Sequence, residues 1–105
     1  MAVYARLSDR ERAKGDAVEL LDGGVRVRLV VNDFLQRDPL SRNALHDRAF
    51  EADFGRFLDE TRPDLLHVHH LAGHGATLPS AARRRGVPVV YQLQDWWAPC
   101  ARVNL

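Results

Sequence analysis

The sequence predicts an α/β fold with a short parallel sheet, flanking helices and a β-hairpin. The clearest observation is the order strand, glycine turn, helix, glycine, strand over residues 65–93. This order is typical of a βαβ unit, whose two strands lie parallel and are joined by a right-handed crossover. Two further observations are a helical apolar stripe before this unit and a glycine turn between two strand-like runs near residue 23.

The hairpin is expected over residues 17–31, around Asp22-Gly23-Gly24. Aspartate and glycine tolerate the positive φ that tight hairpin turns require. In the second run, valines and a leucine alternate with Arg26 and Arg28, so we expect one face of that strand to meet water. Ahead of the hairpin, only Val3-Tyr4-Ala5 suggests the end of a strand.

A helix is expected over residues 43–61. Phe50, Phe54, Phe57 and Leu58 are spaced by four, three and one, which places them on one apolar stripe. Pro63 is expected to end the helix, because the residue before a proline avoids helical angles.

The βαβ unit comprises a buried strand at 65–71, a helix at 76–85 stopped by Gly86, and a strand at 87–93. Pro88 stands near the start of the last strand, where a missing backbone donor is tolerated. Arg83-Arg84-Arg85 falls at the end of the helix and is expected to form a solvated face.

Composition restricts the class of protein. The chain has 105 residues, which is one domain or a piece of one. With 15 basic and 14 acidic residues the net charge is +1, so nucleic-acid binding is not expected. No apolar run is long enough for a membrane span. Cys100 is the only cysteine, which excludes an internal disulfide and favours the reducing cytoplasm.

The densest unusual chemistry follows the two strands of the βαβ unit, at residues 69–75 and 94–100. Ligands of open parallel sheets bind beyond the carboxyl ends of strands. Four of the five histidines lie within eight residues at the first of these strands and just after it: His67, His69, His70 and His74. They suit either a metal site or packing with hydrogen bonding. Because no HExxH motif and no paired cysteines accompany them, we expect no metal.

Asp95, Trp96 and Trp97 follow the second strand directly. A carboxylate there can accept hydrogen bonds from a hydroxyl-rich ligand, and indole faces suit sugar rings. Alternatively, the tryptophans cover the core or a neighbouring domain, and Asp95 caps a helix or pairs with Arg102. Cys100 is expected to be a small buried hydrophobe.

Three strings carry a resemblance to a known family: RPDLLHVHHLAGHG from residue 62, AARRRGVPVV from residue 81, and DWWAPCAR from residue 95. Together, and in this order, they resemble the N-terminal domain of GT-B-fold, family-4-like glycosyltransferases. The resemblance runs from about Ala17 to the C-terminus and includes the glycine hairpin and the Val31-Asn-Asp-Phe34 loop.

The resemblance implies a retaining, hexosyltransferase-like enzyme that transfers a sugar from a nucleotide-sugar donor to an acceptor hydroxyl, with no cofactor. In that family the N-terminal domain mainly shapes the acceptor side of the cleft. The family's polar positions correspond to His70, Asp95 and the residue before Asp95, which is usually histidine and is Gln94 here. Glutamine cannot transfer a proton near pH 7. His74 and Trp96 complete the expected acceptor-binding residues.

The resemblance also implies that residues 1–105 are a partial, acceptor-side domain. The family's first strand, glycine-rich loop and first helix would precede Tyr4, and its C-terminal donor domain would follow Leu105. We therefore expect the isolated chain to be inactive, and its uncovered sheet to favour self-association. Two alternatives remain: a non-catalytic α/β module that binds a ligand or partner chain, and a metal-binding protein that uses the histidines.

Overall fold

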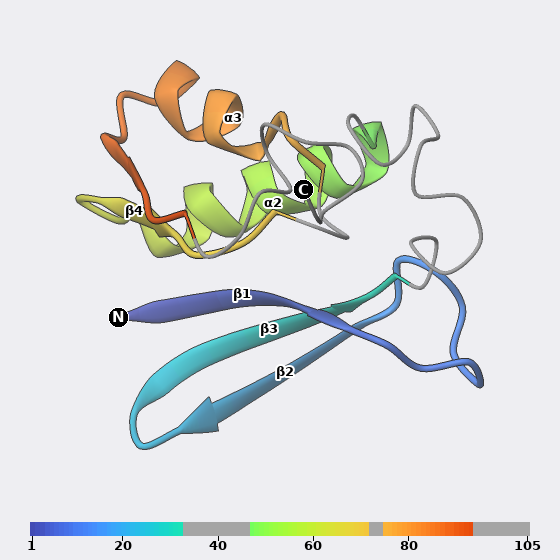
Figure 1. Cartoon of the computed structure of the whole chain (residues 1–105). Coiled ribbons are helices and arrows are strands. Elements are labelled where there is room, and N and C mark those ends of the chain that lie inside the picture. The colour runs from blue at the N-terminus through green and yellow to red at the C-terminus, as the bar shows by residue number, and fades with distance from the viewer. Residues whose placement is uncertain (33–46, 72–74, 94–105) are drawn as a thin grey trace.

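The computed structural model describes residues 1–32, 47–71 and 75–93, and within them it forms two sheets and two helices (Figure 1). The first sheet has the order β1-β3-β2, from β1 (Ala2–Leu7), β3 (Val25–Val31) and β2 (Ala17–Asp22). The second pairs β4 (Leu66–Val68) with β5 (Val89–Tyr91). The helices are α2 (Arg48–Thr61) and α3 (Leu78–Arg84). The predicted α/β class is confirmed.

The predicted hairpin is present. Strands β2 and β3 pair antiparallel, from Ala17 opposite Val30 to Asp22 opposite Val25. Gly23 and Gly24 connect them with φ of 55° and 84°, angles that favour glycine over residues with a side chain.

Strand β1 is longer than its three-residue signal suggests, and it pairs parallel to β3 along its whole length. The register runs from Ala2 opposite Arg26 to Leu7 opposite Val31. The chain therefore passes through the edge strand β2 before it returns to lie between β2 and β1.

The arginine side of β3 faces α2 rather than water, so the sequence-based expectation is wrong. The Tyr4 ring, on the same side of the sheet, meets the Phe54 ring edge-on at a centroid distance of 5.0 Å. The guanidinium of Arg26 lies 5.5 Å from the centroid of the Phe57 ring. Arg28 points the same way because side chains alternate along a strand. Acidic residues of α2 make this position favourable, as described below.

Helix α2 begins after Asp47, five residues later than the expected start at residue 43. Asp47 has an extended backbone, and its carboxylate accepts hydrogen bonds from the backbone N–H groups of Ala49 and Phe50. The helix ends at Thr61 and is capped by Arg62, which is left-handed with φ of 45° and donates its N–H to the Leu58 carbonyl. Pro63 follows, as expected.

The βαβ unit is confirmed with shorter elements than predicted. Strands β4 and β5 are parallel, with His67 opposite Val90, and α3 joins them. Gly86, with φ of 74°, follows the end of α3. The main core lies between α2, α3 and β4, and its buried members are Phe54, Phe57, Leu58, Val68, Leu71, Leu78, Ala81 and Ala82.

Neither helix of the described residues combines the length and the apolarity that crossing a bilayer requires.

Candidate functional site

The carboxyl ends of β4 and β5 lie side by side. Beyond the paired residues, the backbone N–H of Gln92 donates to the carbonyl of Val68 at 2.9 Å, which extends the contact past both strand ends. At the other end, the N–H of Leu66 donates to the Pro88 carbonyl, also at 2.9 Å. The chain segments that leave β4 and β5 therefore start from one edge of the sheet, the usual place for a ligand in a parallel sheet.

His70 lies at this edge, two residues after the end of β4, and its side chain is exposed. Its neighbour Leu71 is only 6% exposed and packs into the main core, so the backbone beside His70 is anchored. The other predicted site residues lie outside the described residues: His74, Gln94, Asp95 and Trp96, together with Trp97, Cys100 and Arg102.

Gly75 and Thr77, which come after β4 in the sequence, belong to the same edge. Gly75, with φ of 96°, donates its N–H to the Leu71 carbonyl at 3.2 Å, so the backbone at Gly75 lies next to Leu71, shortly after the end of β4. Thr77 follows and donates its hydroxyl to Glu51 of α2 at 3.0 Å, which fixes the start of α3. The backbone at this edge is thus held in place by core packing and by hydrogen bonds.

His67 and His69 form a pair on the exposed side of β4. Their ring centroids are 4.1 Å apart, and both side chains are exposed. Val68 between them points into the core, as strand alternation requires. In residues 1–32, 47–71 and 75–93, no group of three or more histidine, cysteine, aspartate or glutamate side chains could hold a metal ion.

The arginine run at the end of α3 is partly neutralised. Arg84 pairs with Glu51, and the Arg85 Nε lies 2.8 Å from Oδ1 of Asp59, so two of the three cations bind α2 instead of water alone. The Arg85 guanidinium, through its hydrogen bonds, holds the pKa of the Asp59 carboxyl below its usual value.

Two depressions lie at the amino ends of β4 and β5, away from the edge that carries His70. One of about 470 Å³ is lined by residues that include Arg83, Gly86 and Pro88. The other, of about 350 Å³, includes Arg62 and Pro63. Both border the amino ends of the strands, where parallel sheets seldom bind ligands. Neither includes a predicted site residue.

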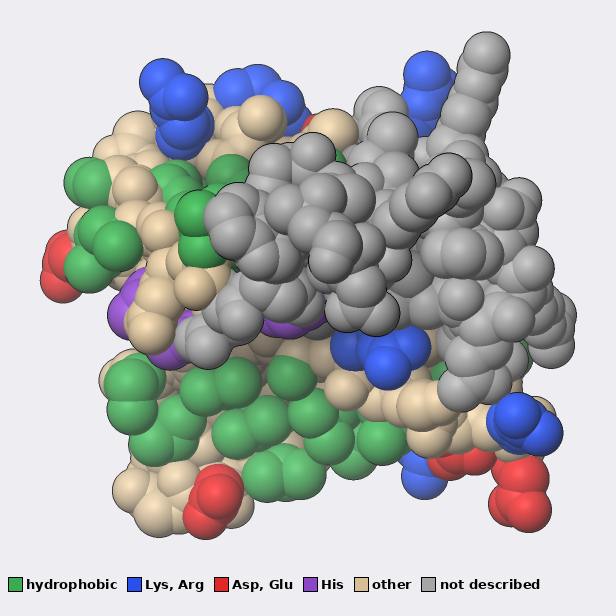
Figure 2. All heavy atoms as spheres, in the orientation of Figure 1, with side chains coloured by type: hydrophobic (Ala, Val, Ile, Leu, Met, Phe, Trp, Pro, Cys, Tyr) green, Lys and Arg blue, Asp and Glu red, His purple; other side chains and the backbone are tan. Residues whose placement is uncertain are grey.

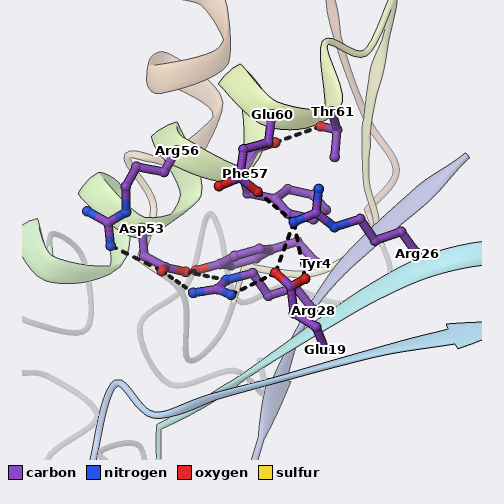
Figure 3. A network of polar contacts seen from close by, with 9 residues as sticks. All are labelled: Tyr4, Glu19, Arg26, Arg28, Asp53, Arg56, Phe57, Glu60 and Thr61. Atoms are coloured by element: carbon purple, nitrogen blue, oxygen red, sulfur yellow. Dashed lines mark hydrogen bonds and ion pairs between the residues drawn. The ribbon is translucent and has the colours of Figure 1, made fainter.

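Sequence reasoning missed a polar network between the first sheet and α2 (Figure 3). The Tyr4 hydroxyl donates to Oδ2 of Asp53 at 2.7 Å, and Arg28 donates to both Asp53 oxygens, at 3.1 Å from Nε and 2.5 Å from Nη2. Asp53 is only 8% exposed. Burial alone would raise the pKa of the Asp53 carboxyl, but the hydrogen bonds from Arg28 and Tyr4 keep it below its usual value. The pKa of Tyr4 is raised, mainly by burial and in second place by the hydrogen bond to Asp53.

The network continues across the sheet through Glu19. Glu19 accepts from Arg28 Nη1 at 2.8 Å and from Arg26 Nη2 at 3.0 Å, and Arg26 also donates to Glu60 at 2.5 Å. Arg26 and Arg28 each bind two carboxylates, so the network holds the first sheet against α2. The charge of these two arginines is therefore balanced within the protein and is not offered to a ligand. A sequence signal existed: Asp53 and Glu60 are seven positions apart, on one face of α2, opposite two alternating arginines.

With this geometry in place, comparison with known families gives a clear result. A family model described as a glycosyl transferase 4-like domain matches residues 2–103. The chain belongs to the glycosyl transferase 4-like family. No curated protein and no solved structure matches it.

Membership confirms the resemblance drawn from the three sequence strings. A glycosyl transferase 4-like domain belongs to proteins that bind a sugar donor and an acceptor. The match covers all three strings. It includes His70, which follows β4, and Asp95, which follows β5 in the sequence.

Proposed function

We propose that this chain forms the acceptor side of a retaining GT-B glycosyltransferase, which transfers a sugar from a nucleotide-sugar donor to an acceptor hydroxyl. The observation that carries the proposal is the meeting of the β4 and β5 carboxyl ends. The Gln92–Val68 hydrogen bond of 2.9 Å joins them, and His70 is exposed directly beyond β4.

In this proposal His70 contacts the acceptor. An imidazole can donate and accept hydrogen bonds, as can each hydroxyl of a sugar. His74 and Gln94 belong to the segments that leave the same edge, and they add further donors and acceptors. Asp95 accepts from an acceptor hydroxyl, and Trp96 covers the apolar face of the ring. Gln94 orients the acceptor without transferring a proton.

The donor is held elsewhere in this proposal. The chain acts as one half of a cleft in a longer polypeptide, and a second domain binds the nucleotide sugar. Cys100 suits a compartment that keeps thiols reduced, such as the cytoplasm. No cofactor is required, because positioning two substrates across a cleft can itself supply roughly 7–11 kcal/mol of the barrier.

Acceptor binding can be mapped on the chain itself. We would titrate the ¹⁵N-labelled chain with methyl glycosides into the millimolar range and follow backbone amide shifts. Shifts should concentrate at His70, Leu71 and Gln92 and be lost in His70→Ala. The matched control, Arg83→Ala, lies beside the depression at the opposite strand ends and should retain them. Shifts confined to that depression would contradict the proposed site.

A further inference from the structure

Two exposed imidazoles, those of His67 and His69, lie side by side and are not used by the proposed acceptor site. His67 belongs to β4 and His69 follows it, and Val68 between them is only 6% exposed and packs into the core. Their ring centroids are 4.1 Å apart, with an angle of 33° between the ring planes. Figure 2 shows histidine side chains, in purple, at the surface next to the hydrophobic band of the first sheet.

The backbone that carries this pair is held on both sides of His67. The N–H of Leu66 donates to the Pro88 carbonyl at 2.9 Å. The N–H of Gln92 donates to the Val68 carbonyl, also at 2.9 Å. A ligand that binds both rings therefore does not have to order the strand first, which lowers the entropic cost of binding.

Two imidazoles at this spacing can bind one transition-metal ion. A metal ion lies about 2.0–2.1 Å from each imidazole nitrogen, so two ligand nitrogens are at most about 4.2 Å apart. The distance of 4.1 Å between the ring centroids is similar, and rotation of the two exposed side chains can bring one nitrogen of each ring to the same ion. Each ring keeps its second nitrogen for a hydrogen bond, which is how metal-bound histidines are usually held.

We propose that His67 and His69 together bind one divalent copper ion. Imidazole nitrogens suit copper, and among divalent first-row metals copper binds a given set of nitrogen ligands most tightly. Within residues 1–32, 47–71 and 75–93, no third histidine, cysteine or carboxylate joins the pair to make a larger metal-binding group. Water therefore completes the coordination, and the ion exchanges with solvent. The expectation of no metal followed from missing sequence motifs, whereas the spacing of the rings is seen only in the structure.

This copper site and the proposed acceptor site use different residues. His70 is the described residue proposed to contact the acceptor, and the copper ligands are His67 and His69. A chain that binds no copper would leave the proposed function untouched. Loss of methyl glycoside binding in His70→Ala would leave the copper site untouched.

Isothermal titration calorimetry with copper(II) chloride tests the proposal on the 105-residue chain. The titration covers about 1 μM to about 1 mM copper at a pH of about 7.5, at which ordinary imidazoles are mostly neutral and able to bind a metal. His67→Ala and His69→Ala should each weaken copper binding by about tenfold or more, because each leaves a single imidazole. His70→Ala, the matched control, removes the neighbouring exposed histidine and should keep the affinity of the unaltered chain.

A second measurement locates the ion. Because Cu²⁺ is paramagnetic, it should broaden the backbone amide signals of His67, Val68 and His69 first. Zn²⁺ should shift the same signals at higher concentration, and Mg²⁺, which prefers oxygen ligands, should not. Far-UV circular dichroism checks that the variants fold, and His67→Asn or His69→Asn replaces an alanine variant that does not. Three results would overturn the proposal: no copper binding, unchanged affinity in the folded His67 and His69 variants, or an equal loss in His70→Ala.

Discussion

The hydroxyl of Tyr4 and the carboxylate of Asp53 are 49 positions apart in sequence and 2.7 Å apart in space. This hydrogen bond joins the first strand to the middle of α2, and Arg28 binds the same carboxylate from β3. The first sheet and the helix are thus held by a charged contact as well as by the rings of Tyr4, Phe54 and Phe57.

Two substitutions at this contact should lower the free energy of unfolding by different amounts. Tyr4→Phe keeps the ring and loses one hydrogen bond, which should cost about 1 kcal/mol in the free energy of unfolding. Asp53→Ala leaves Arg28 without its buried partner and should cost about 2–3 kcal/mol. Urea unfolding measures both. Arg83→Ala, the control, should change the value by less than about 0.5 kcal/mol. An Asp53→Ala variant as stable as this control would show that the network does not hold the fold.

Stability should fall in acid partly because of Asp53. Its folded pKa lies below the ordinary value of 3.8, so the stabilisation is present above that value and is lost as the pH falls through the folded pKa. Urea unfolding at a series of pH values between about 6 and 2 should show this loss. Asp53→Asn should be less stable at neutral pH and should show a flatter dependence. Parallel curves for the two proteins would count against the assignment to Asp53.

The cap of α2 should contribute separately. Asp47→Ala removes a carboxylate that accepts from two backbone N–H groups and lies 2.7 Å from Lys14 Nζ. We expect a loss of about 1–2 kcal/mol. Lys14→Ala, which removes only the half-exposed cation, should cost about 0.5 kcal/mol. Thermal or urea unfolding distinguishes the two, and equal losses would assign the effect to the ion pair instead of the cap.

The sequence predicts local structure well because local structure depends on nearby residues. The Asp22-Gly23-Gly24 turn, the phenylalanine stripe of α2 and the stop at Gly86 each come from adjacent or helically spaced side chains. It did not predict the pairing of β1 with β3, which brings Ala2 opposite Arg26 and depends on contacts between distant segments. Alternation shows that a strand has two faces, but not which face a helix covers. For that reason the environment of Arg26 and Arg28 was predicted wrongly.

At the candidate site, the structure confirms the meeting of the two strand ends and does not test the roles of the residues. A βαβ order places two strand ends together, and the Gln92–Val68 contact confirms that placement. His70 lies at this edge. The roles of Gln94, Asp95 and Trp96 came from a family resemblance, and they remain predictions.

The isolated chain should not transfer sugar at an enzyme-like rate. In our proposal a second domain holds the donor, and without it the two substrates are not positioned together. Mass spectrometry of the chain incubated with nucleotide sugars and hydroxyl-bearing acceptors should show no glycosylated product. Turnover by these 105 residues alone would mean that the donor site lies within them.

The most direct test of the acceptor site is Asp95→Asn in a longer polypeptide that contains this domain and transfers sugar. The change keeps the shape of the side chain and removes its charge. We expect acceptor turnover to fall by about a hundredfold or more, while the thermal midpoint shifts by no more than a few degrees. If instead the variant unfolds at a much lower temperature and its folded fraction turns over normally, Asp95 is a structural residue and the proposed acceptor site is wrong.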